Sequence, residues 1–214
     1  MAEMKALATL IGDVVGSRTS SDRAELHGRL TKVVDSANTA LTPTTPLRIT
    51  VGDEFQGTFA TVGAAIHASL WLRLELLPDA DLRHGLGWGE VGVLDEQPRV
   101  EDGPGWWAAR AAIEDVRAQS MRPGLRAMRT RYQRADRQPG PDPAAVNAAL
   151  IGRDQLLGAG DARTFRLLRG MVAGRSQRDL AGEEGISASA ISQRVRHDGL
   201  AAVLAADALL QEVA

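Results

Sequence analysis

The first 60 residues carry a strand–helix–hairpin pattern that restricts this chain to a few mixed α and β folds. Residues 5–12 (KALATLIG) form a short apolar run, which is typical of a strand buried on both faces. Residues 23–41 place leucine and valine at helical spacing. Two further apolar runs, 47–51 and 55–60, flank a Gly-Asp-Glu turn. They predict a β-hairpin, because glycine permits the backbone geometry of a tight turn.

The pattern continues to about residue 120. Residues 61–77 predict a strongly apolar helix, and the glycine-punctuated residues 81–94 predict one bent strand or a hairpin. Residues 103–120 begin with Gly-Pro-Gly and predict another helix. The resulting order, β-α-β-β-α-β-(β)-α, predicts an α+β fold of the ferredoxin-like or palm type.

The composition changes after residue 120. Residues 121–143 contain six arginines and end in a Pro/Gly-rich run, so we expect a basic helix or loop followed by a linker. The arginines at 122–137 could form a solvated face or a phosphate clamp. We therefore divide the chain into a palm-like domain, 1–138, and a small all-α domain, 143–214, with a boundary near 139–143.

Composition limits the cellular compartments and the partners that we expect for the chain. The 214 residues are 44% hydrophobic, have a formal net charge of −2 and contain no cysteine. A globular protein in a reducing cytoplasm is expected, and any nucleic-acid partner must bind a local basic patch. No window is apolar enough to suggest a membrane span or a signal peptide, so no membrane partner is expected.

Two aspartates suggest a metal site. Asp13 follows the first predicted strand, and Asp53 lies at the hairpin tip, so both are expected to point into one crevice. Two convergent carboxylates can hold Mg²⁺ or Mn²⁺ against a triphosphate, with Glu54 as a spare ligand. Each aspartate alone is also an ordinary turn residue.

The residues after Asp13 suggest a phosphate cradle. The backbone N–H groups of Val14, Val15 and Gly16 are expected to face phosphate, and Ser17 belongs to the same nucleotide-binding stretch. Trp106 is expected in the core, in the pocket wall or stacked on a base, since an aromatic face serves each purpose.

These motifs resemble those of known families. IGDVVGS, ITVGDEFQG and RHGLGWGEV, followed by a glycine-led helix, are similar to class III adenylyl and guanylyl cyclases and, more distantly, to diguanylate cyclases. The combination with a C-terminal helix-turn-helix and the GPGWWAAR stretch resembles the SatD family. The resemblance covers roughly residues 5–118 of the palm-like part and implies that Asp13 and Asp53 bind two metal ions.

The sequence also departs from the cyclase pattern. The purine-reading lysine of the cyclases, four residues before the hairpin aspartate, is replaced by Ile49, with Arg48 offset by one. An asparagine four residues before the transition-state arginine is replaced by Trp106, while Arg110 is retained as the candidate catalytic residue. Loss of one positioned donor commonly costs about 10²–10³ in rate. The resemblance therefore leaves enzymatic activity open.

The C-terminal segment predicts a helix-turn-helix within about residues 163–198, with a turn at Gly185. Its second helix exposes residues suited to phosphate and base-edge contacts in duplex DNA: Ser187, Ser189, Gln193, Arg194 and Arg196. Five arginines between 163 and 178 make this region locally basic. The same geometry also serves plain packing or dimerisation. Residues 200–213 are apolar on more than one helical face and favour a homodimer.

Three functions follow. The leading interpretation is a regulator that binds a nucleotide or nucleotide second messenger with a divalent metal and controls transcription through the helix-turn-helix. The alternative is a nucleotidyl cyclase or other phosphoryl-transfer enzyme that uses two metals. The third is an interaction protein with a vestigial site.

Overall fold

The structure is a computed structural model that describes residues 4–17 and 22–214. In chain order its elements are β1 (Lys5–Val14), α1 (Arg23–Leu41), β2 (Thr45–Ile49), β3 (Phe55–Phe59), α2 (Val62–Leu76), β4 (Leu82–Glu96), β5 (Arg99–Asp102), α3 (Pro104–Gln119), η2 (Pro123–Leu125), β6 (Thr130–Arg134), α4 (Pro143–Gly158), α5 (Ala162–Val172), α6 (Gln177–Glu184), α7 (Ala188–His197) and α8 (Leu200–Gln211). Among these elements, no helix is long and apolar enough to cross a membrane.

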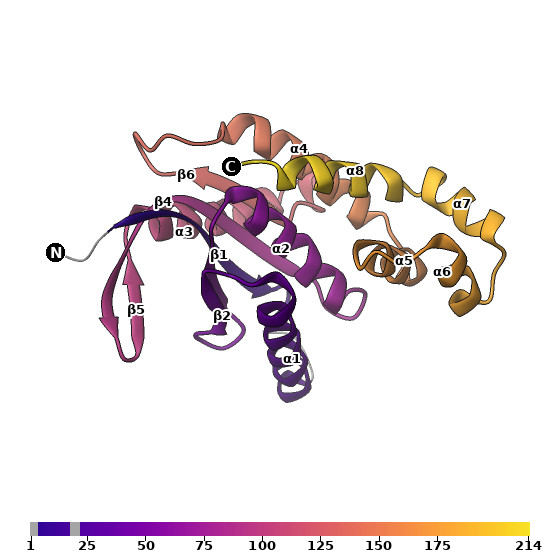
Figure 1. Ribbon diagram of the computed structural model, residues 1–214, viewed down its shortest axis with the longest axis horizontal. Coiled ribbons are helices and arrows are strands. Elements are labelled where there is room, and N and C mark those ends of the chain that lie inside the picture. Colours follow the sequence, from indigo (N-terminus) through magenta and orange to yellow (C-terminus); the bar gives the residue numbers. More distant parts are fainter. Residues whose placement is uncertain (1–3, 18–21) are drawn as a thin grey trace.

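The sheet has the predicted ferredoxin-like topology. Its order is β2-β3-β1-β4, and β1 runs antiparallel to both β3 and β4 (Figure 1). β5 forms a hairpin with the far end of β4, so of the two alternatives for residues 81–94 one long strand with a hairpin partner is observed. β6 adds to β4 in parallel. The α+β prediction is therefore confirmed.

Both faces of the central strand are covered. Ala8, Leu10 and Val14 of β1 belong to the core shared with α1 and α2, whereas Leu7 and Ile11 pack against α3. Because side chains alternate along a strand, Asp13 lies on the same face as Leu7 and Ile11. This alternation directs the Asp13 carboxylate toward α3.

The prediction of a basic helix or loop over residues 121–143 is wrong at β6. Thr130 and Tyr132 are buried, and they alternate with the half-buried Arg131 and Gln133. Five residues with a single aromatic side chain give too weak an apolar signal for a strand. Three of the six arginines have structural partners: Arg129 pairs with Asp81, Arg131 pairs with Asp115, and Arg134 donates to the Gly140 carbonyl.

The C-terminal helices pack against the sheet domain. Val146 and Leu150 of α4 and Leu210 of α8 belong to the same core as β1 and α2. A second core joins Leu70 and Leu74 of α2 to α5, α6, α7 and α8. Residues on the two sides of the predicted boundary at 139–143 therefore share both cores.

Part of the apolar surface of residues 200–213 is covered within the chain. Leu200, Val203 and Leu210 of α8 are buried, where the helix packs on α2, α4 and α7. Leu209 of the same helix is 68% exposed. The homodimer therefore stays a prediction.

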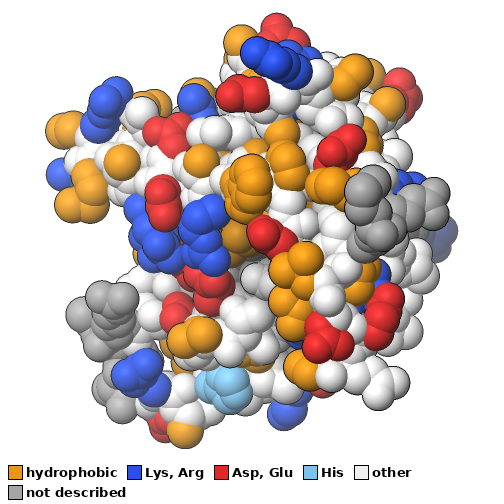
Figure 2. All heavy atoms as spheres, turned by 90° about the vertical axis from the view of Figure 1, so that its left-hand side faces the viewer, with side chains coloured by type: hydrophobic (Ala, Val, Ile, Leu, Met, Phe, Trp, Pro, Cys, Tyr) orange, Lys and Arg blue, Asp and Glu red, His pale blue; other side chains and the backbone are white. Residues whose placement is uncertain are grey.

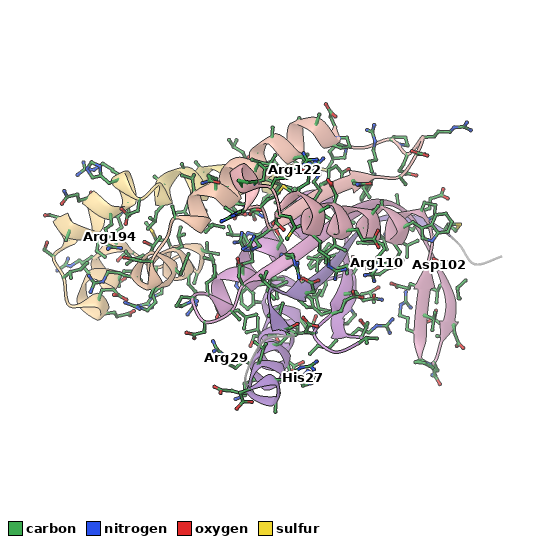
Figure 3. The ribbon with its side chains drawn as sticks, turned by 180° about the vertical axis from the view of Figure 1, so that it is seen from behind. His27, Arg29, Asp102, Arg110, Arg122 and Arg194 are labelled. Carbon is green, nitrogen blue, oxygen red and sulfur yellow. The ribbon has the colours of Figure 1, made fainter. Side chains whose placement is uncertain are left out.

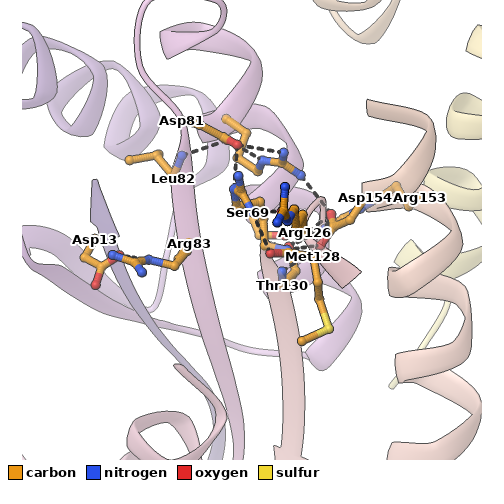
Figure 4. A network of polar contacts seen from close by, with 12 residues as sticks. Asp13, Ser69, Asp81, Leu82, Arg83, Arg126, Met128, Thr130, Arg153 and Asp154 are labelled. Atoms are coloured by element: carbon orange, nitrogen blue, oxygen red, sulfur yellow. Dashed lines mark hydrogen bonds and ion pairs between the residues drawn. The ribbon is translucent and has the colours of Figure 1, made fainter. Parts of the chain in front are cut away.

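A buried polar network ties α2, β4, β6 and α4 together (Figure 4). The Asp154 carboxylate accepts from the Arg73 guanidinium at 2.8 Å and from the backbone N–H groups of Arg129 and Thr130 at 2.7 Å each. Arg73 also donates to Asp81 at 2.9 Å. Buried charges are retained only where they are paired and hydrogen-bonded in this way.

Candidate functional site

Asp13 lies near the end of β1 and is held by two arginines. The antiparallel register places Arg83 of β4 directly opposite Asp13, and its Nε donates to the carboxylate at 2.8 Å (Figure 4). Arg117 of α3 donates to the other carboxylate oxygen through Nε at 3.1 Å and also through Nη2. The Asp13 carboxylate is 6% exposed, so these two guanidinium groups form most of its polar environment.

The hairpin between β2 and β3 brings Asp53 to the same place. Gly52 adopts a φ of 66°, which glycine tolerates in a tight turn. One carboxylate oxygen of Asp53 then accepts a hydrogen bond from the Val14 N–H at 3.1 Å. The two aspartates line one pocket of about 670 Å³, here named the carboxylate pocket, whose walls are Asp13, Val14, Gly16, Ser17, Val51, Asp53, Glu54, Arg83 and Arg117.

Glu54 forms the rim of the carboxylate pocket. Both its oxygens accept from the Arg110 guanidinium at 2.7 Å, which is a two-point pairing of a planar fork with a carboxylate. These hydrogen bonds lower the pKa of Glu54 against the opposing effect of burial. Arg110, predicted as the catalytic residue, is therefore paired with Glu54 and reaches the pocket only through that carboxylate.

Charges in and next to the carboxylate pocket balance. Three carboxylates, Asp13, Asp53 and Glu54, face three guanidinium groups, those of Arg83, Arg117 and Arg110. Acidic and basic side chains also lie next to each other on the face shown in Figure 2. A divalent cation at Asp13 would therefore compete with Arg83 and Arg117 for the carboxylate oxygens.

The residue types still suit Mg²⁺ or Mn²⁺, because carboxylate oxygens are the ligands that these hard cations prefer. Among residues 4–17 and 22–214, however, no group of three or more His, Cys, Asp or Glu side chains is arranged to hold a metal. Two aspartates alone leave coordination positions for ligand oxygens and water. Asp13 and Asp53 would therefore suit a metal ion that binds together with a phosphate ligand.

The predicted phosphate cradle is only partly present. The Val14 N–H is bonded to Asp53, and the Val15 N–H donates to the Asp81 carbonyl at 2.8 Å. Val15 is absent from the described wall of the pocket, whereas Gly16 and Ser17 line it. Of the three positions expected for Trp106, the structure has the core position, where the residue is 8% exposed between β1 and α3.

Arg83 and Arg117 were not among the site residues predicted from the sequence. Arg83 could have been found by aligning residues 5–14 against 82–91 as antiparallel partners, since Asp13 then faces it. Arg117 lies seven residues after Arg110 and so projects from the same face of one helix. Neither signal involves a recognisable motif, because an ion pair across a sheet depends on register.

The residues predicted to bind DNA lie at the other end of the molecule. Figure 3 shows Arg194 on α7, far from Arg110 and from His27 on α1. Ser189, Gln193 and Arg196 are exposed, whereas Ser187 caps α7 by accepting from the Ala190 N–H. Arg194 is bound in two places by Asp161, at 2.9 Å each, and stabilises the start of α5.

Most arginines near α7 have acidic partners. Arg163 and Arg166 both pair with Glu184, and Arg175 pairs with Glu183. The predicted basic surface is therefore largely neutralised by the chain itself. The acidic partners come from α6, which the arginine count in the sequence did not weigh.

Comparisons with solved structures find adenylyl and guanylyl cyclases. A bacterial light-regulated adenylyl cyclase is 15% identical with a TM-score of 0.48, over 62% of this chain and 44% of that chain. The adenylyl cyclase CyaB from P. aeruginosa is 15% identical with a TM-score of 0.42, over 51% of this chain and 71% of that chain. The monomeric guanylyl cyclase domain of the RhoGC fusion protein from the aquatic fungus Blastocladiella emersonii is 16% identical with a TM-score of 0.45, over 53% of this chain and 77% of that domain.

Comparison with curated protein sequences gives no match. A model of the SatD family matches residues 7–211. This match extends from β1 to the end of α8 and thus includes the carboxylate pocket and the C-terminal helices. The chain belongs to the SatD family.

Proposed function

We propose that the carboxylate pocket binds a nucleoside triphosphate together with Mg²⁺ or Mn²⁺. The observation that supports it is the convergence of Asp13 and Asp53 with Arg83 and Arg117 in one pocket of about 670 Å³. Carboxylates suit the cation and guanidinium groups suit phosphate oxygens, so the pocket contains both halves of a metal–triphosphate site.

Binding would exchange ion-pair partners. A metal–triphosphate carries a net charge of about −2, and the carboxylate pocket is balanced without it. Arg83 and Arg117 would turn from Asp13 to the phosphates, and the metal would take their place on the Asp13 carboxylate. The side chain of Arg117 is 42% exposed, so it has room to move. Each charge then keeps an opposite partner in both states.

Calorimetry with GTP or ATP tests this exchange. The parent should bind the nucleotide in Mg²⁺ and bind it about tenfold more weakly in EDTA. Asp13→Asn removes the metal ligand and frees the arginines, so its affinity in EDTA should be higher than that of the parent and should no longer depend on Mg²⁺. Asp102→Asn, an exposed aspartate outside the pocket, is the control. Equal metal dependence in the parent and Asp13→Asn would overturn the proposal.

The alternative of a nucleotidyl cyclase or other phosphoryl-transfer enzyme rests on the same pocket. Two aspartates and neighbouring arginines are also what a two-metal displacement requires. Release of pyrophosphate from a nucleoside triphosphate in Mg²⁺ or Mn²⁺ would establish that activity. Binding without any pyrophosphate favours the nucleotide-responsive regulator.

DNA binding by α7 is a second proposed function, and the observation in its favour is the exposure of Ser189, Gln193 and Arg196 on one short helix. A mobility shift with genomic fragments at several salt concentrations tests it. Arg196→Ala should reduce the salt slope of log affinity by about one unit if this arginine contacts phosphate. The absence of any shift at low salt would exclude this function.

A further inference from the structure

A second pocket adjoins the carboxylate pocket. It lies between α1 and β2, has a volume of about 860 Å³ and shares Ser17 and Asp53 with the carboxylate pocket. We name it the α1–β2 pocket. Its apolar wall is formed by Leu26, Leu30, Val34, Leu47 and Ile49. The two pockets therefore lie side by side, and the α1–β2 pocket combines this apolar wall with charged residues that include Arg23 and Arg48.

Helix α1 adds polar side chains to this apolar wall. His27, Thr31 and Asp35 line the pocket at intervals of four residues and therefore follow one face of the helix. Figure 3 shows His27 on this helix. The Thr31 hydroxyl donates to the His27 carbonyl at 2.9 Å. Asp35 is exposed, and among the described residues its carboxylate has no ion-pair partner within 4.0 Å.

We propose that the α1–β2 pocket holds the nucleoside of the nucleotide whose phosphates occupy the carboxylate pocket, which rests on the function proposed above. Because the α1–β2 pocket shares Ser17 and Asp53 with the carboxylate pocket, a nucleotide whose phosphates lie at Asp53 can place its sugar and base there. The flat, apolar faces of a base suit the leucine, valine and isoleucine wall.

Asp35 would make this pocket favour some nucleobases over others. An ionised carboxylate only accepts hydrogen bonds, so it favours a base edge that presents N–H groups. The guanine edge carries adjacent imino and amino donors, which a two-oxygen acceptor can engage together. Residues of a single chain would then supply both the phosphate and the base contacts.

Tripolyphosphate separates the two pockets experimentally, because it has phosphates but no nucleoside. The parent should bind GTP with Mg²⁺ about tenfold or more tightly than tripolyphosphate with Mg²⁺. Thr31→Trp should block the α1–β2 pocket, abolish this difference and leave tripolyphosphate affinity unchanged. Asp35→Asn, at an exposed position, should weaken GTP binding alone.

Thr39→Trp is the matched control for Thr31→Trp. Thr39 lies on the same helix, is exposed, and its hydroxyl donates to the carbonyl four residues earlier, as that of Thr31 does. It does not belong to the described lining of the α1–β2 pocket. Its GTP affinity should equal that of the parent, and circular dichroism should show both variants folded.

The outcomes distinguish the two proposals. If the parent binds neither GTP nor tripolyphosphate in Mg²⁺, the proposed function fails. If the parent binds both but Thr31→Trp and Asp35→Asn retain the parental GTP affinity, the nucleoside lies elsewhere and only the inference about the α1–β2 pocket fails. An equal loss of GTP affinity in Thr31→Trp and Thr39→Trp would also overturn that inference.

Discussion

His84 should make the stability of the fold depend on pH. The ring is fully buried on β4, lies edge-on to Phe55 with centroids 5.8 Å apart, and has no hydrogen-bond partner for either nitrogen among the described residues. Burial, followed by the charges of Arg73 and Arg153, lowers the pKa of His84 from 6.5 to about 3, although Asp81 acts in the opposite direction. The folded protein therefore keeps this ring neutral.

The sign follows from proton uptake. Between pH 6.5 and pH 3 the unfolded chain binds a proton at His84 and the folded chain does not, so acid favours unfolding in this window. Each pH unit within it costs up to about 1.4 kcal/mol. Lowering the pH from 7.5 to 5 should therefore remove about 2 kcal/mol of folding free energy through this residue.

Urea unfolding of the parent and of His84→Leu at pH 7.5 and pH 5 isolates this effect, because other groups titrate equally in both proteins. The parent should lose about 2 kcal/mol more than the variant between these pH values. At pH 7.5 the variant should be at least as stable as the parent, since it no longer buries two unpaired nitrogens. His197→Leu, at an exposed position, should behave like the parent. Equal pH dependence in the parent and His84→Leu would refute the reasoning.

Two further substitutions test the packing and the buried network. A Cβ on Gly12 would lie 2.2 Å from the ring of Phe55, so Gly12→Ala should lower the unfolding free energy by about 1–3 kcal/mol. Gly28 on α1 has open space around it, so Gly28→Ala should raise the unfolding free energy by about 0.5–1 kcal/mol in the same urea titration. Asp154→Ala removes the carboxylate that faces the buried Arg153 and one of the two carboxylates that pair with Arg73, and should cost about 3–5 kcal/mol by thermal or urea unfolding. Asp79→Ala, which breaks an exposed pair, should cost about 1 kcal/mol or less, and similar losses for Asp154→Ala and Asp79→Ala would contradict this ranking.

The sheet was predictable because its signals are local. The apolar run at 5–12, the helix at 23–41 and the Gly-Asp-Glu turn determine strand order almost without tertiary information, and the structure has α1 at Arg23–Leu41. The turn also predicted that Asp53 would meet Asp13, and both line the carboxylate pocket. A strand end and a hairpin tip are both set by local sequence, so their relative position could be predicted.

The remainder of the site depends on contacts between distant segments. The pairing of Asp13 with Arg83 joins residues 70 positions apart, and that with Arg117 joins residues 104 apart. The number of arginines in a sequence does not reveal which carboxylates neutralise them, so the basic surface predicted around α7 was overestimated. The packing of α8 against its own chain was missed for the same reason. The sequence of an apolar helix is the same whether its own chain or a partner covers it.

A continuous set of polar contacts leads from the carboxylate pocket to the C-terminal helices. The Val15 N–H, two residues from Asp13, donates to the Asp81 carbonyl, and the Asp81 side chain holds Arg73, which in turn donates to Asp154 of α4. Spatial continuity alone does not establish energetic coupling, and reciprocity supplies the criterion: a nucleotide that changes DNA affinity must have its own affinity changed by the same factor. Because the Arg73–Asp154 ion pair at one end of this path is buried, a ligand that shifts Asp81 would disturb charges that water does not reach. The network therefore either transmits a discrete rearrangement or holds the two regions as one rigid body, and a relative rotation about residues 139–143 alone is incompatible with the cores they share.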